Sequence, residues 1–275
     1  MDVHALGAEV DRAPLHHSAF ALVRSVRERL GDWIGRAWTP AIAAITRARH
    51  SRMFHPEGLV FRARVDAVIG GRFAALGGDL EGHALVRCSA ALWKREHTPR
   101  WLRRFDVLGM ALRLRHGAKA PTTERAEPGD QDLLFATIRS PLTMLASPFT
   151  TNATDYLHQR YWAVSPFQIP DGERVELRLV PIEQPTLIGA RETRLVQAVQ
   201  LGAAVWELEA RETLHLGWHR VARITLEAPL EIDQEALRFD PFRTGAGIEP
   251  VGLVHAIRRA VYAAGQLSRP PRESA

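Results

Sequence analysis

The sequence predicts an α+β protein built on a single antiparallel β-barrel of about eight strands with flanking helices. Several short segments alternate apolar and polar side chains with a period of two, and turn-forming residues separate them. Helical periodicity is strongest at the two ends of the chain. The 275 residues suffice for one barrel with a sizeable core.

The first predicted element is a helical stretch over residues 17–48. Phe20, Val23 and Leu30 recur at helical spacing, with arginines elsewhere on the helical wheel. Either this helix packs against the barrel or it lies as a basic amphipathic helix on a membrane surface. The first interpretation is favoured because most amphipathic helices pack on their own domain. Residues 1–50 are therefore expected to form an N-terminal helical arm.

The strands begin at residues 59–68, where Phe61 and Val65 alternate with Arg62 and Arg64. Further strands are expected at 83–93, 104–115, 132–138, 175–181, 203–214 and 221–227. The intervening segments are expected to be a turn at 68–80, a polar loop at 115–131 and a mixture of short helix and loop at 141–170.

A final helix is predicted at 252–269, because Leu253, Ile257 and Val261 lie on one side of it. Residues 51–270 should thus form one domain that comprises the barrel and this helix. Residues 271–275 are expected to be a disordered tail.

The composition limits the partners and the compartment. The net charge is +5, and the arginines are dispersed rather than gathered in a basic arm, which argues against nucleic-acid binding. Cys88 is the single cysteine, so the chain has no internal disulfide. The N-terminus lacks the pattern of a signal peptide and no stretch is long and apolar enough for a membrane span, so a cytoplasmic protein is expected.

One residue pair in the final helix has distinctive chemistry. Arg258 and Tyr262 share a helix face, and a nearby guanidinium stabilises a phenolate. A phenolate is a suitable axial ligand for ferric haem iron. Such a pair alone is most often a packed tyrosine beside a surface arginine, so the interpretation depends on its surroundings.

Those surroundings resemble the haem catalases, whose pattern is Phe-Asp-Pro, then Gly-Ile-Glu-Pro, then a helix with Arg-xxx-Tyr. The matching residues are Phe239, Asp240, Pro241, Gly247, Ile248, Glu249, Pro250, Arg258 and Tyr262. The spacing from Gly-Ile-Glu-Pro to the arginine is one residue shorter than in the family. Three motifs upstream follow the family's order: Arg52 to His55 to Gly58, then Val86-Arg87-Cys88-Ser89, then Asp106 to Gly109 to Ala111. Downstream, Arg269 lies seven residues after the tyrosine, as in the family.

The resemblance implies a catalase-like barrel with a haem cofactor, expected to be haem b, whose iron is bound by Tyr262. Arg258 would keep this tyrosine anionic. Ser89 would hydrogen-bond to His55 and fix its tautomer, and His55 would act as the general acid–base toward a peroxide. The haem propionates would be held by Arg52, Arg87 and Arg269.

One departure from the family affects the expected activity. Catalases carry an asparagine on the peroxide side of the haem, whereas this chain has Ala136 there, and Thr137 should point to the other face of the strand. A peroxidase-type reaction on hydrogen peroxide or an organic hydroperoxide, with a reducing substrate, is therefore expected first. True catalase activity, rearrangement of a lipid hydroperoxide as in the allene oxide synthase branch, and haem binding without catalysis stay open.

A second departure is size: the short N-terminal arm and the final helix wrap less chain around the barrel than in the family, which would make the haem more accessible to organic substrates in an apolar pocket. Four apolar residues could line it or belong to the ordinary core: Phe54, Met110, Leu134 and Phe135. Catalases assemble through arms that this chain mostly lacks, so self-association into a homo-oligomer also stays open.

Overall fold

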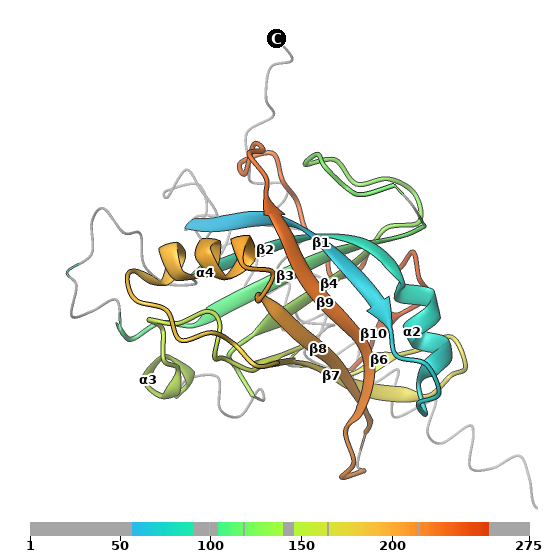
Figure 1. The fold of residues 1–275 in the computed structure, drawn as a ribbon. Coiled ribbons are helices and arrows are strands. Elements are labelled where there is room, and N and C mark those ends of the chain that lie inside the picture. The colour runs from blue at the N-terminus through green and yellow to red at the C-terminus, as the bar shows by residue number, and fades with distance from the viewer. Residues whose placement is uncertain are drawn as a thin grey trace, which may run out of the picture.

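A computed structural model describes residues 57–90, 99, 104–117, 119–139, 146–163, 165–213 and 215–252. The predicted arm at 1–50, the tail at 271–275 and all but the first residue of the helix at 252–269 lie outside these residues. The described chain forms a β-barrel with short helices beside it (Figure 1). None of the described helices is long and apolar enough to cross a membrane.

Eight strands close the barrel, in the order β7, β5, β4, β3, β2, β1, β9, β8 and back to β7, and all of their pairings are antiparallel. Their bounds are β1 Glu57–Ala67, β2 Gly82–Ala90, β3 Leu108–His116, β4 Gln131–Ala136, β5 Tyr161–Trp162, β7 Arg174–Pro181, β8 Val205–Glu212 and β9 His219–Pro229. The short strand β6 (Phe167–Gln168) pairs with β7, and β10 (Glu249–Pro250) pairs with β6. The predicted fold class is therefore confirmed.

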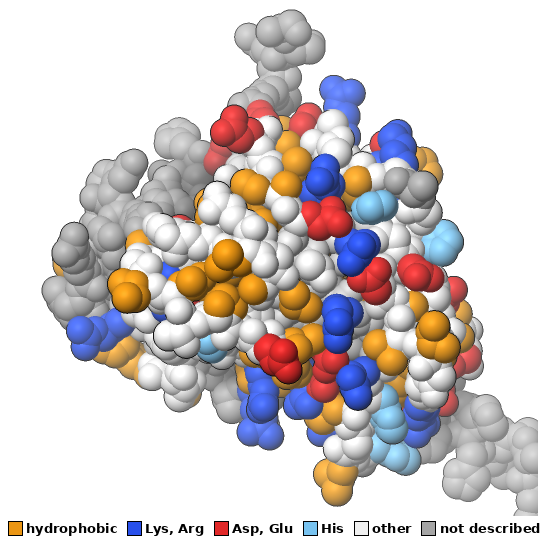
Figure 2. Space-filling model, viewed as in Figure 1, with side chains coloured by type: hydrophobic (Ala, Val, Ile, Leu, Met, Phe, Trp, Pro, Cys, Tyr) orange, Lys and Arg blue, Asp and Glu red, His pale blue; other side chains and the backbone are white. Residues whose placement is uncertain are grey.

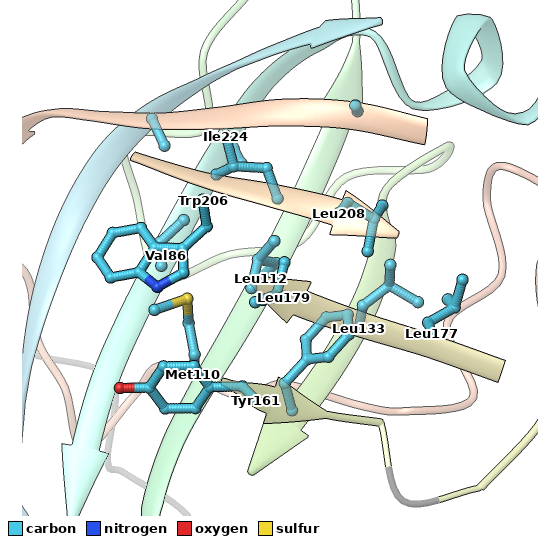
Figure 3. Close-up of a cluster of buried hydrophobic side chains, with 14 of the residues drawn as sticks. Val86, Met110, Leu112, Leu133, Tyr161, Leu177, Leu179, Trp206, Leu208 and Ile224 are labelled. Atoms are coloured by element: carbon cyan, nitrogen blue, oxygen red, sulfur yellow. The ribbon is translucent and has the colours of Figure 1, made fainter. Parts of the chain in front are cut away.

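The interior of the barrel is filled by the side chains that alternate inward from these strands. Figure 3 shows Met110 between the rings of Trp206 and Tyr161, with aliphatic side chains from β3, β4, β7 and β8 around them. All of these residues are buried. A core filled in this way leaves the outer face of the barrel as the place for a large ligand.

Within the described residues, three helices accompany the strands: α2 (Ala74–Leu80), α3 (Ser147–Thr150) and α4 (Arg191–Gln200). The expectation of a plain turn at 68–80 was wrong, because α2 occupies most of it. Two glycines disfavour this helix in isolation, but Gly77 lets it lie directly against β9, where a Cβ would come within 2.5 Å of the Val221 carbonyl oxygen. The helix α4, which buries Leu195 and Val199 against the barrel, was not predicted from the sequence either.

The outer face of β7, β8 and β9 carries cross-strand ion pairs. Arg178 Nε lies 2.6 Å from Glu209 Oε2, and Arg220 Nη1 lies 3.3 Å from Glu207 Oε1. Figure 2 shows the resulting mixture of basic and acidic side chains on this side of the molecule. This part of the barrel wall is solvated, as the alternating pattern of its strands predicts.

Candidate functional site

The opposite part of the barrel wall is buried on both faces. Along β7 and β8, buried and partly exposed residues alternate, whereas nearly every residue of β2, β3 and β4 is buried. A strand buried on both faces packs against something on each side. The outer face of β2–β4, together with the adjoining part of β1 around the buried Val60, is therefore the candidate site.

Three rows of side chains cross this outer face, because directly opposed residues of antiparallel strands share a face. The rows are Gly58–Ser89–Gly109–Ala136, Val60–Arg87–Ala111–Leu134 and Arg62–Leu85–Arg113–Asp132. The residues between them, such as Val86, Met110 and Leu133, point into the core (Figure 3). The structure thus brings the predicted site residues Arg87 and Ser89 together in neighbouring rows.

The first row, here called the small-residue row, consists of small side chains and is closely packed at Gly58. Ser89 and Ala136 in this row are buried. Gly58 has no space for a side chain, since a Cβ would lie 2.7 Å from the Cys88 carbonyl oxygen and 2.8 Å from Arg87 Cζ. The row, together with the half-buried Ala111 and Leu134 of the next row, forms a floor of small and apolar side chains.

Arg87 stands at the edge of this floor and is only 4% exposed. Its Nε donates a hydrogen bond to Gln234 Oε1 over 3.2 Å. The Gln234 amide nitrogen in turn donates to the Gly58 carbonyl oxygen over 2.8 Å. These contacts fix the plane of a buried guanidinium beside an apolar surface.

The side chain of Ala136 is part of this floor, as the register with Gly109 requires. The side chain of the next residue, Thr137, is not part of it. The Thr137 hydroxyl receives hydrogen bonds from the backbone N–H of Leu108 over 3.1 Å and from the Thr151 hydroxyl over 2.9 Å. The expectation that Thr137 is directed elsewhere is consistent with these contacts. In this row, Ser89 therefore supplies the polar side-chain group.

The structure separates the residues that were considered as the lining of an apolar pocket. Met110 and Phe135 belong to the barrel interior and are buried in its core, so they do not line the outer face. Leu134 lies on the outer face beside Ala111. Phe54 falls outside the described residues.

The third row anchors the segment that leads to the final helix. Arg113 and Asp132 are completely buried, with Arg113 Nε 3.0 Å from Asp132 Oδ1. Asp132 also accepts hydrogen bonds from the backbone N–H of Asp240, over 2.8 Å, and from Arg243. Burial raises the pKa of Asp132, although its ion pairs with Arg113 and Arg243 act in the opposite direction.

A second anchor holds the Gly-Ile-Glu-Pro part of the segment. Gln131 donates to the Ile248 carbonyl oxygen over 3.2 Å and accepts from the Ala246 N–H over 3.3 Å. Leu237 and Phe239 meanwhile pack against the outer-face residues Val60 and Leu85. The chain between 230 and 252 is thus fixed across the outer face of β1–β4, just before the predicted Tyr262 helix.

The described tyrosines are poor candidates for a phenolate ligand. The chain has three tyrosines, and two of them, Tyr156 and Tyr161, are buried in the barrel core. Burial raises the pKa of both phenols. Burial likewise raises the pKa of the Cys88 thiol to about 12, which disfavours a thiolate ligand.

Five predicted site residues fall outside the described residues: Arg52, His55, Arg258, Tyr262 and Arg269. Four residues that hold the site together were not predicted from the sequence: Gln131, Asp132, Arg113 and Gln234. The opposite charges within the largely apolar strands β3 and β4 were a usable indication of Arg113 and Asp132. Gln234 carried no such indication, since it lies in an irregular segment far from Arg87 in the sequence.

Comparison with known proteins gives a likeness in fold alone. No protein-family model and no curated protein matches the chain. Among solved structures, a bacterial catalase is similar with a TM-score of 0.51 and 13% identity, over 80% of this chain and 57% of the catalase. A fungal catalase is similar with a TM-score of 0.51 and 15% identity, over 98% of this chain and 65% of the catalase. The chain thus spans less than two thirds of either protein, and its barrel is catalase-like.

Proposed function

We propose that this chain is a haem-dependent oxidoreductase of the peroxidase type that acts on hydrogen peroxide or an organic hydroperoxide. The observation that carries the proposal is the outer face of β1–β4, where the buried Arg87 borders a floor of small and apolar residues. The catalase-like fold of the barrel supports the same assignment.

The described residues fit a haem. A tetrapyrrole is flat and apolar with two carboxylates at one edge, so it requires a flat apolar surface and cations beside it. The row with Gly58 and Ala136 would provide the surface, since its side chains are small. Arg87 provides one cation, and guanidinium groups bind carboxylates in a planar, two-bonded geometry.

Each site residue then has a defined task. Haem, when bound, supplies the redox-active iron at which the O–O bond of a hydroperoxide is cleaved. Tyr262 would ligate that iron, and Arg258 would stabilise its phenolate. Arg52, Arg87 and Arg269 would hold the propionates.

Proton transfer would fall to His55. Its imidazole would take the proton from one oxygen of the hydroperoxide and return it to the other oxygen as the O–O bond breaks. The Ser89 hydroxyl would hold the imidazole in the required tautomer. A reducing substrate supplies two electrons and two protons are taken up, so that the hydroperoxide becomes an alcohol and water.

The floor favours an organic hydroperoxide over efficient hydrogen peroxide dismutation. Ala136 places a methyl group where catalases have a carboxamide, and Leu134 and Ala111 extend the apolar surface. The same feature favours a second candidate, the rearrangement of a lipid hydroperoxide. Rearrangement consumes no electron donor, so product analysis with an acyl hydroperoxide, with and without a donor, separates the two reactions.

The optical spectrum tests the haem site. We expect the protein expressed with ample haem to show a Soret band with a high-spin ferric tyrosinate pattern, and Tyr262→Phe to alter it. Hydroperoxide consumption should then fall about 100-fold or more in His55→Ala. A wild-type protein that gives no Soret band after haemin is added to it would overturn the proposal, and unchanged consumption in His55→Ala would remove the catalytic part of it.

A further inference from the structure

We infer that Gln234 is a positioning residue that presents the Arg87 guanidinium to a ligand carboxylate. The inference deepens the proposed function and rests on it, because the carboxylate in question is a haem propionate. It assigns a role to the segment between β9 and the Phe-Asp-Pro sequence, where none was expected.

The geometry shows a clamp with two ends. At one end, Arg87 Nε donates a hydrogen bond to Gln234 Oε1 over 3.2 Å. This bond fixes the rotation of the planar guanidinium about the side-chain axis. At the other end, the Gln234 amide nitrogen donates to the Gly58 carbonyl oxygen over 2.8 Å. Both polar groups of the amide are used, so its orientation is fixed as well.

Gly58 completes the clamp by packing. A Cβ at position 58 would lie 2.8 Å from Arg87 Cζ and 2.9 Å from Arg87 Nη2, so the guanidinium lies directly against the glycine backbone. One face of the guanidinium is therefore supported by β1, and its Nε edge is held by Gln234. Those two constraints set the direction of the Nη1–Nη2 edge, which is the edge that binds a carboxylate with two parallel hydrogen bonds.

The neutral amide of Gln234 is suited to this task. A carboxylate at this position would form an ion pair with the guanidinium and compete with an incoming anion. Glutamine makes the same acceptor contact without adding a negative charge of its own. Gln234 thus orients Arg87 without placing a carboxylate against it.

The test compares two ligands that differ only in their carboxylates, haemin and haemin dimethyl ester. Each is titrated into the full-length apoprotein and followed by its Soret band. The variants are Gln234→Leu, which removes both hydrogen bonds, and Gln234→Glu, which keeps the acceptor and adds a charge. The matched control is Gln184→Leu, since Gln184 is also half-buried and donates to the backbone carbonyl oxygens of Ile182 and Val205, on the other side of the barrel.

We expect wild-type protein and Gln184→Leu to prefer haemin over its diester, and both Gln234 variants to lower that preference about tenfold. Affinity for the diester should stay nearly constant across the series. A Gln234→Leu variant that keeps the wild-type preference would overturn the inference and leave haem binding intact. If Gln234→Leu does not fold, the preference of Gln234→Glu decides in the same way. Wild-type protein that binds neither ligand would remove the proposed function, and the inference with it.

Discussion

Arg113 and Asp132 form an ion pair across β3 and β4 in which both side chains are fully excluded from solvent, with Arg113 Nε 3.0 Å from Asp132 Oδ1. Asp132 also binds the segment between residues 238 and 243, because it accepts hydrogen bonds from the N–H of Asp240 and from the side chain of Arg243. It therefore connects the stability of the barrel to the position of the chain that leads into the predicted Tyr262 helix.

Breaking this pair should be costly. Asp132→Ala leaves a buried guanidinium without its carboxylate, and we expect the free energy of unfolding to fall by about 3–5 kcal/mol. The double variant Arg113→Met/Asp132→Leu should recover most of that loss, because both fully buried charges are removed together and Arg243, which loses its partner, is partly exposed. Urea denaturation followed by circular dichroism measures both. As a control, Glu207→Ala breaks a pair with the largely exposed Arg220 and should cost at most about 1 kcal/mol; an equal cost for Asp132→Ala would contradict the prediction.

A neighbouring carboxylate gives a prediction for acid stability. Burial of Asp130 opposes its ionisation, but hydrogen bonds from Arg115 and the backbone N–H of Glu127, with the nearby positive charges, outweigh this effect and lower its pKa. A carboxyl with a lowered folded-state pKa stabilises the native state above its unfolded pKa of about 3.9. That stabilisation is lost as the pH falls through the folded-state pKa.

Asp130→Asn should therefore flatten the dependence of the free energy of unfolding on pH below about pH 4. Urea midpoints measured at a series of pH values test this, with Asp79→Asn on the exposed side of α2 as the control. Parallel curves for wild-type protein and Asp130→Asn would show that Asp130 titrates alike in the folded and unfolded states.

The strands were predictable where one side of the barrel is solvated. Residues such as those of β8 and β9 alternate because water covers the outer face, and that alternation is visible in the sequence. In β2–β4 both faces are buried, so the sequence indicates strands but not which face carries the site. Arg87 and Ser89 were predicted as site residues from the resemblance to the haem catalases. Only the register of the strands shows that they share a face with Ala136.

The missed elements depend on tertiary contacts. The helix α2 contains two glycines and forms because Gly77 lets it approach the Val221 carbonyl oxygen. The N-cap residue of α4, Ala190, makes no side-chain capping bond, so the sequence does not mark the start of that helix. Gln234 gains its role only when the chain beyond β9 folds back over β1 and β2, a long-range contact that spacing in the sequence cannot reveal.

Ser89 offers a test of the proton-transfer half of the proposed site. Ser89→Ala should lower the rate constant for hydroperoxide turnover about 10- to 100-fold while haemin affinity stays unchanged, because we propose that the hydroxyl orients the His55 imidazole rather than holding the cofactor. On that proposal the pH profile of turnover should shift as well, since the imidazole would lose a hydrogen-bond partner. Ser165→Ala is the matched control, because Ser165 is also buried but its hydroxyl has no hydrogen-bond partner in the described part of the chain. Equal turnover in the two variants would assign Ser89 to packing alone.

The last prediction concerns the choice of peroxide at Ala136. Ala136→Asn places a carboxamide in the small-residue row beside Gly109, which separates it from Ser89, on the face where we place the haem. A polar group there can orient hydrogen peroxide, so oxygen evolution from hydrogen peroxide should rise about tenfold or more and turnover of a bulky organic hydroperoxide should fall. Leu134→Asn puts the same group on the same face but one row away, and it should not raise oxygen evolution. Thermal melts of both variants establish that each is folded, and an equal effect of the two substitutions would show that position 136 does not determine which peroxide is used.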